Sequence, residues 1–178
     1  MDLQIRLAIP VDAEIVALLG RITFTETFGH LFAEHADDLR AYLDHTFAVA
    51  KIRNSLGEPA NRYWLGYLNG LPIGYAKLKF PSLIHLLPNQ EPAQLQKIYV
   101  LREFLARSFG KRLLSAVLED SARRGLDTLW LDVLKQNARA IRFYDREGFV
   151  PLGDDTYSIG AQTFEFHLMA RRGVTGSN

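Results

Sequence analysis

The segment from Leu95 to Lys111 contains the residues whose types and spacing are best suited to chemistry. It reads LQKIYVLREFLARSFGK and runs from a β-like stretch through a short basic turn into a helical pattern. Free backbone N–H groups at a helix N-terminus, the helix dipole and the cations Arg107 and Lys111 all favour an anionic ligand. The turn at Ser108 and Gly110 therefore predicts a binding site for a phosphorylated ligand. A plain helix start with solvated basic residues is the alternative.

A second group of residues follows from Asn137 onward. Asn137 stands where a helix N-cap belongs, and Ile141, Tyr144 and Gly148 continue one helical face at i+4, i+7 and i+11. Two helical turns span about 10 Å, so one ligand could touch both Asn137 and Tyr144. A phenol, with an ordinary pKa of about 10, is protonated at neutral pH and can donate a proton to a thiolate. Plain helix capping and a core-edge tyrosine are the alternatives.

Composition limits the classes to which the chain can belong. With 178 residues, 48% hydrophobic and 23% charged, we expect one domain over residues 1–170 and a disordered tail at 171–178. Lys plus Arg (21) nearly balance Asp plus Glu (20), so no overall field favours nucleic acid or an anionic membrane. The absence of cysteine excludes disulfides, thiolate zinc sites and a cysteine nucleophile. No apolar run reaches a membrane span, and we expect a cytoplasmic protein without a metal site.

Hydrophobic periodicity and turn residues predict the elements that must position these groups. We expect strands at Leu3–Ile9, Leu95–Val100, Leu126–Leu134, Gly148–Leu152 and Tyr157–Ala170; helices from Pro10, at Asp37–Phe47, from Phe109 to a cap at Gly125, and at Asn137–Glu147; and a hairpin of Arg62–Leu68 with Pro72–Phe80 around Asn69-Gly70. Ser82 to Ala93 is expected to be a long exposed loop. The order of elements predicts a mixed α/β fold, not a doubly wound parallel sheet.

The order of elements, the turn after IYV and the block NARAIRFY before Gly148-Phe149 resemble the Gcn5-related N-acetyltransferase (GNAT) superfamily over residues 3–170. The segments TFTETFG, DLRAYL and LQKIYV resemble the bacterial PaiA-type polyamine acetyltransferases within it. The resemblance implies an α/β (α+β) fold with a mixed, mostly antiparallel sheet of about six to seven strands and about four helices. It also implies a splayed parallel pair formed by Leu95–Val100 and Leu126–Leu134.

The resemblance implies acetyl-CoA as cosubstrate. In the superfamily, a Q/R-x-x-G-x-G/A turn binds the pyrophosphate through backbone N–H groups. The matching positions here are Leu105, Ala106, Arg107, Ser108, Phe109 and Gly110, followed by Lys111. Leu105 and Ser108 depart from the pattern, and a positive φ at Ser108 would be strained. Backbone donation does not depend on the side chain, so the departures do not by themselves remove binding.

Family members also bind the pantetheine arm along the first splayed strand and the sulfur beside the later helix. Residues matching these contacts are Ile98, Tyr99, Val100, Asn137 and Phe143, with Tyr144 as the acid that protonates the departing thiolate. A backbone N–H near Ile98 to Val100 would stabilise the oxyanion.

The proton acceptor is left unassigned. Many relatives have a glutamate where this chain has Gln94, and glutamine cannot accept a proton at neutral pH. Glu91, His85 and Glu26 are possible substitutes, although each is more simply a surface group.

The resulting hypothesis is an acetyl-CoA-dependent N-acetyltransferase in which a small-molecule primary amine, with a polyamine as first choice, attacks the thioester directly in a ternary complex. Acidic residues at Glu26, Asp37, Asp38 and Asp44 either suit helix starts or attract a cationic acceptor. We expect no nucleic-acid or membrane partner, and a homodimer is one option. The alternatives are a non-catalytic coenzyme A-binding module on the same fold and a protein or peptide N-acetyltransferase.

Overall fold

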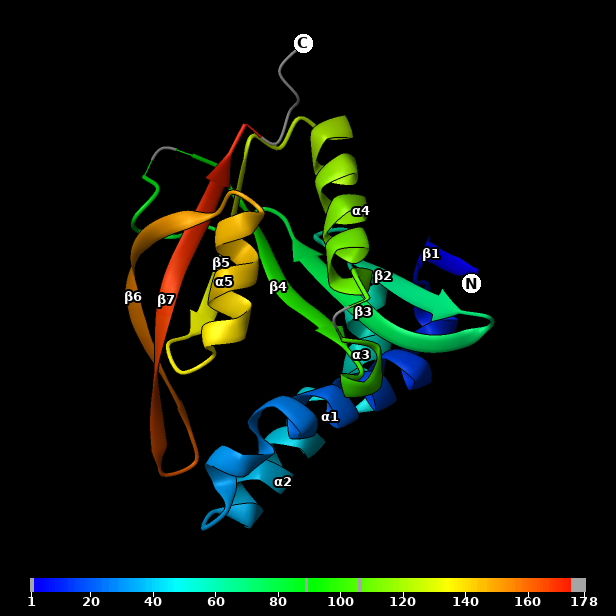
Figure 1. The fold of residues 1–178 in the computed structure, drawn as a ribbon, viewed down its shortest axis with the longest axis vertical. Helices are drawn as coiled ribbons and strands as arrows, with labels where there is room; N and C mark the ends of the chain where they lie inside the picture. The colour runs from blue at the N-terminus through cyan, green and yellow to red at the C-terminus, as the bar shows by residue number, and fades with distance from the viewer. Residues whose placement is uncertain (1, 89, 106, 174–178) are drawn as a thin grey trace. The chain divides into compact units, whose positions relative to one another are not determined.

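The computed structural model describes residues 2–88, 90–105 and 107–173, which form two compact units. The first unit contains the residues up to Leu78 together with Lys97–Val117, and the second contains Lys79–Gln96 and the residues from Leu118 onward. Strand β4 (Ala93–Val100) and helix α4 (Phe109–Arg123) contribute residues to both units (Figure 1).

The first unit combines helices with an antiparallel group of strands. Its elements are β1 (Leu3–Leu7), η1 (Pro10–Asp12), α1 (Ala13–Phe28), η2 (Gly29–Phe32), α2 (Ala36–Thr46), α3 (Val49–Gly57), β2 (Asn61–Leu68), β3 (Leu71–Lys79) and η3 (Arg102–Phe104). Strand β1 pairs with β2 in antiparallel register. Asn69 and Gly70 adopt φ values of 49° and 83°, the positive angles that a tight two-residue hairpin requires. The hairpin prediction is confirmed.

The core of the first unit lies between α1, α3 and the hairpin. Val16 and Leu65 are fully buried there, and Tyr75 of β3 packs with them. Gly20 of α1 permits the close approach of Phe47, because a Cβ at position 20 would lie 2.3 Å from a Phe47 ring carbon. The helices therefore fix the position of β3 from one side.

The second unit is built on β5 (Thr128–Leu134), α5 (Ala138–Arg146), β6 (Val150–Ile159) and β7 (Gln162–Arg172). Strand β7 pairs antiparallel with both β5 and β6, and Figure 1 shows α5 packed beside these strands. The N-terminal end of β4 pairs in parallel with β5. Trp130, Leu168 and Ala170 form a small core with Leu87 from the loop before β4.

Hydrogen-bonded neighbours among the strands follow the order β1-β2-β3-β4-β5-β7-β6. The fold is a seven-stranded mixed sheet with helices and one parallel pair, as predicted. In the described part of the chain, no helix is long and apolar enough to cross a lipid bilayer.

Several predicted element boundaries need correction. Helix α3 was not predicted. Strand β6 continues through Tyr157 to Ile159, so the last strand begins after the turn and not at Tyr157. The loop from Ser82 to Ala93 is not uniformly exposed, because Leu87 is buried against Trp130. Strand β7 extends to Arg172, two residues into the expected tail; residues 174–178 of that tail lie outside the described residues.

Candidate active site

The N-terminus of α4 presents main-chain donors that have no acceptor among the described residues. Strand β4 leads through η3 to the first residue of α4, Phe109. The Leu105 N–H donates to the Arg102 carbonyl at 3.2 Å. Within the described residues, the N–H groups from Arg107 to Gly110 have no acceptor. Ala106 lies outside the described residues. Four consecutive donors at the positive end of a fifteen-residue helix fit an anion such as a diphosphate.

Ser108 adopts the left-handed conformation that the sequence pattern reserves for glycine. Its φ is 60°, and Asn69 is the other non-glycine residue with positive φ in the described part of the chain. A left-handed residue that carries a Cβ costs about 1 kcal/mol. The turn thus keeps a glycine-like backbone although the side chain has changed, and the Ser108 hydroxyl is exposed beside Arg107 and Lys111.

The C-terminal end of β4 lies unusually close to β3 in the first unit. A Cβ at Gly74 would lie 2.4 Å from the Tyr99 carbonyl oxygen and 3.1 Å from the Val100 Cα. Directly after the strand, the Leu101 N–H donates to the Ile73 carbonyl at 2.8 Å. Gly74 therefore sets the path by which β4 enters the turn before α4. The predicted main-chain contacts of Ile98, Tyr99 and Val100 with a ligand remain predictions.

Tyr144 of α5 lies in an aromatic environment in the second unit. Its ring centroid is 5.3 Å from that of Phe143 and 5.6 Å from that of Phe149. Burial raises the pKa of the Tyr144 phenol, and the negative charge of Asp132 raises this pKa further. The phenol therefore remains protonated well above neutral pH, as a proton donor requires.

Asn137 caps α5. Its side-chain Oδ1 accepts a hydrogen bond from the Ala140 N–H at 3.1 Å. This is the capping role that the sequence left open as an alternative to ligand binding. The Asn137 side chain therefore stabilises the start of α5, and its predicted contact with the cofactor remains a prediction.

The parallel pairing of β4 with β5 is short. It joins Ala93 to Leu129 and Gln94 to Trp130, and Leu95 and Gln96 have no register partner on β5 in the described part of the second unit. The described pairing of the two strands ends at Gln94, and the predicted splay of the pair remains a prediction.

Asp132 differs from the other residues of β5 in its exposure. The strand reads TLWLDVL, and all its residues are buried except Asp132. The Gln94 side-chain Nε2 donates to Asp132 Oδ1 at 3.0 Å. Sequence reasoning did not single out Asp132, although an aspartate inside an otherwise apolar run was a visible signal.

The other candidate proton acceptors are placed elsewhere. Glu26 of α1 accepts the Arg102 N–H at 2.9 Å, and its backbone carbonyl accepts a hydrogen bond from the Arg102 guanidinium, so it caps η3 in the first unit. His85 is an exposed residue of the loop before β4.

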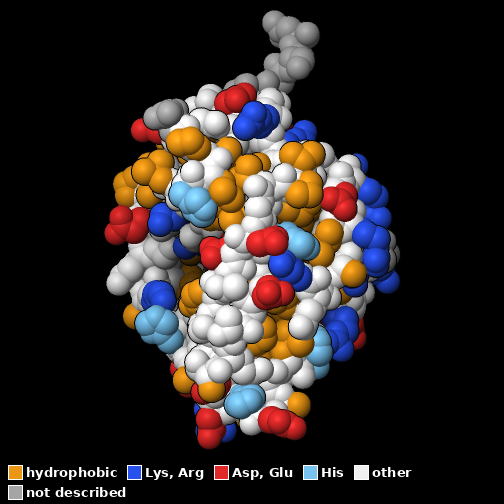
Figure 2. All heavy atoms as spheres, turned by 90° about the vertical axis from the view of Figure 1, so that its left-hand side faces the viewer, with side chains coloured by type: hydrophobic (Ala, Val, Ile, Leu, Met, Phe, Trp, Pro, Cys, Tyr) orange, Lys and Arg blue, Asp and Glu red, His pale blue; other side chains and the backbone are white. Residues whose placement is uncertain are grey.

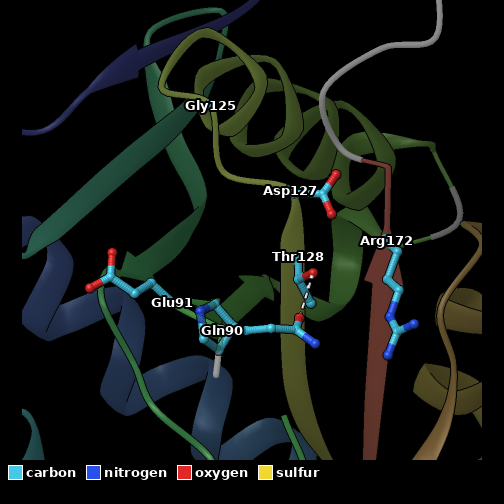
Figure 3. Close-up of a pocket in the computed structure, with 7 residues that line it drawn as sticks. Gln90, Glu91, Gly125, Asp127, Thr128 and Arg172 are labelled. Atoms are coloured by element: carbon cyan, nitrogen blue, oxygen red, sulfur yellow. Dashed lines mark hydrogen bonds between the residues drawn. The ribbon is translucent and has the colours of Figure 1, made fainter. Parts of the chain in front are cut away.

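Glu91 lines a separate pocket of about 370 Å³ in the second unit. Figure 3 shows Asp127, Thr128 and Arg172 on one side of this pocket, with Gln90 reaching toward Thr128 and Glu91 extending away from it. Thr128 begins β5, four residues before Asp132, which corresponds to about 13 Å along a strand. The pocket, and Glu91 with it, therefore lies at the opposite end of β5 from Asp132.

Charged side chains of both signs alternate on the face of β6 and β7 that Figure 2 turns toward the viewer. Asp154 of β6 contacts Lys135 Nζ at 3.0 Å and His167 Nδ1 at 2.8 Å. These neighbours lower the pKa of Asp154, chiefly through the His167 hydrogen bond. Acidic and basic side chains therefore lie together here, and this face shows no broad field of a single sign.

Residues 24–149 match the model of the acetyltransferase (GNAT) family, and this match covers most of the chain. The chain belongs to that family. It is an N-acetyltransferase that uses acetyl-CoA as cosubstrate.

Three similar proteins illustrate the range of relatives. An uncharacterised N-acetyltransferase from Mycobacterium tuberculosis is 27% identical over 161 residues, 90% of this chain and 97% of the relative. A ribosomal protein bS18-alanine N-acetyltransferase from Salmonella typhimurium is 39% identical over 59 residues, 33% of this chain and 40% of the relative. The crystal structure of the PaiA N-acetyltransferase from Thermoplasma acidophilum with coenzyme A has a TM-score of 0.75 at 19% identity, covering 97% of this chain and 99% of that one.

Proposed function

We propose that this chain transfers the acetyl group of acetyl-CoA to the primary amine of a small molecule. The amine nitrogen attacks the thioester carbonyl directly while both reactants are bound, and Tyr144 donates a proton to the departing thiolate. No covalent intermediate with the protein is required, in keeping with the absence of cysteine. Holding two reactants close together in the correct orientation can itself contribute several kcal/mol to lowering the barrier.

The observation that carries the proposal is the row of main-chain N–H groups from Arg107 to Gly110 without an acceptor among the described residues. A diphosphate is the part of coenzyme A that such a row suits, because each N–H can donate to a phosphate oxygen. Main-chain groups of Ile98 to Val100 are proposed to contact the pantetheine arm, as in addition of a strand. The Asn137 amide nitrogen and Phe143 are proposed to contact the cofactor near its thioester.

A polyamine is the first acceptor to test, on the strength of the PaiA-like segments. The acidic residues near the first helices give this choice limited support, because each already contacts a partner. Asp44 lies 2.8 Å from Arg21, and Asp37 lies 3.5 Å from Arg40. Glu26 caps η3. A cationic acceptor would have to compete with these contacts.

The amino terminus of a peptide is the second candidate acceptor. The local similarity to the ribosomal protein bS18-alanine N-acetyltransferase supports it, although that similarity covers 33% of this chain. Both acceptors present an uncharged amine at the moment of attack, so the cofactor site does not distinguish them.

The test is release of free thiol from acetyl-CoA against three acceptor panels: spermidine and other polyamines, monoamines, and short peptides with an N-terminal alanine. Turnover of small amines with peptides inert is the expected result. Turnover of peptides alone would replace the small-molecule proposal with the second candidate. Acetyl-CoA binding without thiol release in any panel would favour the non-catalytic module.

A further inference from the structure

Helix α1 of the first unit carries a stripe of exposed apolar side chains. Val11, in η1 directly before the helix, is 75% exposed, and Leu18 and Ile22 of the helix are 60% and 39% exposed. Ile15 lies between them and is partly buried. Because steps of three and four residues return to the same side of a helix, positions 11, 15, 18 and 22 form one continuous stripe.

The stripe lies outside the core of the first unit. The core takes the opposite side of α1, where Val16, Gly20 and Thr23 are buried. Single exposed apolar residues are common on protein surfaces, whereas adjacent ones mark sites of interaction. The exposed side of α1 is therefore a candidate surface for a partner.

Two charged residues of α1 border the stripe along one flank. Glu14 precedes Leu18 by four residues and Arg21 follows it by three. With 3.6 residues per turn, both lie about 40–60° to one side of Leu18 around the helix. Ile15 and Ile22 lie at matching angles on the other side. The exposed side of α1 thus has an apolar flank and a charged flank, with Leu18 between them.

Both charged residues have a partner within the chain, and both pairs are at the surface. Glu14 contacts Arg53 of α3 at 3.2 Å, and the two side chains are exposed. Arg21 contacts Asp44 of α2 at 2.8 Å, and these side chains are exposed as well. Exposed pairs contribute little to stability, so each charge can gain a further partner of opposite sign at small cost.

We infer that this side of α1 binds the same side of α1 in a second copy of the chain, with the two helices antiparallel and Leu18 at the two-fold axis. Such an axis keeps each flank against the same flank of the partner and reverses the chain direction. Ile22 therefore lies opposite Ile15 of the second copy, and Glu14 lies opposite Arg21 of the second copy. The surface is complementary to itself in both shape of pattern and charge.

The charges select this arrangement over two others. Parallel helices would place the charged flank of one copy against the apolar flank of the other, which desolvates Glu14 and Arg21 without a partner across the interface. A lipid surface is disfavoured because the stripe is bordered by Glu14 and Asp44, and surface-bound helices carry mainly basic residues beside the apolar face. The inference does not depend on acetyl transfer.

The first test measures the mass of the full chain by sedimentation velocity over a series of concentrations. We expect the wild type to reach twice the monomer mass of 20.2 kDa. Leu18→Asp brings two carboxylates together at the axis and should raise the dissociation constant of the dimer at least about 100-fold. Leu71→Asp is the matched control, because Leu71 at the start of β3 is 54% exposed. It should leave the dimer unchanged.

The second test mixes two charge variants at low ionic strength, where surface charges act most strongly. Glu14→Arg leaves only basic residues on the flank, and Arg21→Glu leaves only acidic ones, so each variant alone should dimerise at least about tenfold more weakly. One copy of each forms both oppositely charged contacts, and the mixture should regain the dimer. Mixing does not repair a variant that has lost its structure, so recovery reports the contact itself.

Several results would overturn the inference. The first is a wild type that remains monomeric up to about 0.1 mM. If that monomer binds vesicles of phosphatidylcholine and phosphatidylglycerol and Leu18→Asp does not, the stripe binds lipid instead. A second is a dimer that Leu18→Asp leaves intact. A third is a pair of charge variants that dimerise as well as the wild type, or whose mixture fails to dimerise. If Leu18→Asp does not fold, the charge variants decide alone.

Discussion

The N-terminus of α4 and the region of Asp132 and Tyr144 differ in the chemical groups that they offer: main-chain groups in the first and side-chain groups in the second. The first offers main-chain N–H groups from Arg107 to Gly110, whose chemistry is the same for any side chain. The second offers the carboxylate of Asp132 and the phenol of Tyr144, and no backbone group has the acid–base chemistry of either. We therefore expect substitution to be tolerated in the first region and to need compensation in the second.

Departures from the family pattern follow this difference. Leu105 and Ser108 replace signature residues of the turn, yet Ser108 keeps a φ of 60° and the N–H groups from Arg107 to Gly110 have no acceptor among the described residues. Gln94 replaces a glutamate, and its amide instead contacts the carboxylate of Asp132 on the neighbouring strand. Main-chain function needs only the conformation to be preserved, whereas side-chain function needs the chemical group itself.

The largest expected effect is that of Tyr144→Phe on the rate. The substitution keeps the ring against Phe143 and Phe149 and removes only the proton donor. Loss of a positioned general acid lowers kcat by about 100- to 1000-fold. Acetyl-CoA affinity should change little, since the proposed role of the hydroxyl is to protonate the departing sulfur. Steady-state thiol release and a separate binding titration measure the two quantities.

Tyr157→Phe is the control for this substitution, because Tyr157 is an exposed residue of β6 at 56% accessibility. It should leave both kcat and affinity unchanged. Equal kcat values for wild type and Tyr144→Phe would show that Tyr144 is not the general acid. The second region would then have no demonstrated side-chain role for this residue.

The next largest effect is a difference in affinity between two ligands. It tests the main-chain donors at the N-terminus of α4 without any substitution. Coenzyme A carries the diphosphate that the donors from Arg107 to Gly110 suit, whereas pantetheine lacks it. Several charge-assisted hydrogen bonds of about 1.5 kcal/mol or more each should make coenzyme A bind at least about 100-fold more tightly. Calorimetric titration of both ligands measures the ratio. Equal affinities would show that the α4 N-terminus does not hold the diphosphate.

The sequence predicted well those features that depend on neighbouring residues. The Asn69-Gly70 hairpin follows from two adjacent residues that accept positive φ. A six-residue pattern identified Ser108 as a position where a positive φ would be strained, and the structure gives it a φ of 60°. The mixed α/β fold followed from the order of elements, each of which is coded locally.

Features that depend on distant residues were missed. Gln94 and Asp132 are 38 positions apart, and their contact exists only because β4 and β5 are neighbours in the sheet. Helix α3 has Ala48 as its N-cap, without a side-chain hydrogen bond, so no start signal marks it. The irregular register between Pro151 and Gly153 lets β6 continue where a break was predicted.

A smaller effect concerns stability, and it comes from a side-chain contact within the first unit. Arg6 binds the buried Asp12 through two hydrogen bonds of 2.7 and 2.8 Å, and this guanidinium lowers the pKa of Asp12. Since the folded-state pKa lies below the unfolded one, the stabilisation is present above about pH 4 and is lost as the pH falls further. Asp12→Asn should cost about 1–2 kcal/mol at pH 7.

Urea unfolding at pH 7 and at pH 3 measures this cost, and the difference between wild type and variant should shrink at the lower pH. Asp44→Asn is the matched control, because Asp44 pairs with Arg21 at a site where the Asp44 side chain is 60% exposed. An exposed pair contributes less than about 1 kcal/mol, so this control should change stability little at either pH.

The smallest effect is that of Ser108→Gly, and it tests whether conformation alone defines the α4 N-terminus. Glycine adopts positive φ without the Cβ penalty, but it also gives the unfolded chain more freedom, so the net gain in stability should be at most about 1 kcal/mol. Coenzyme A affinity should stay within about tenfold of wild type, because the main-chain donors are unchanged and only one hydroxyl is lost. Asn69→Gly is the control: it has the same type of backbone at the hairpin and should leave affinity unaltered. A large loss of affinity in Ser108→Gly alone would mean that the hydroxyl holds the phosphate, and the region would then depend on a side chain after all.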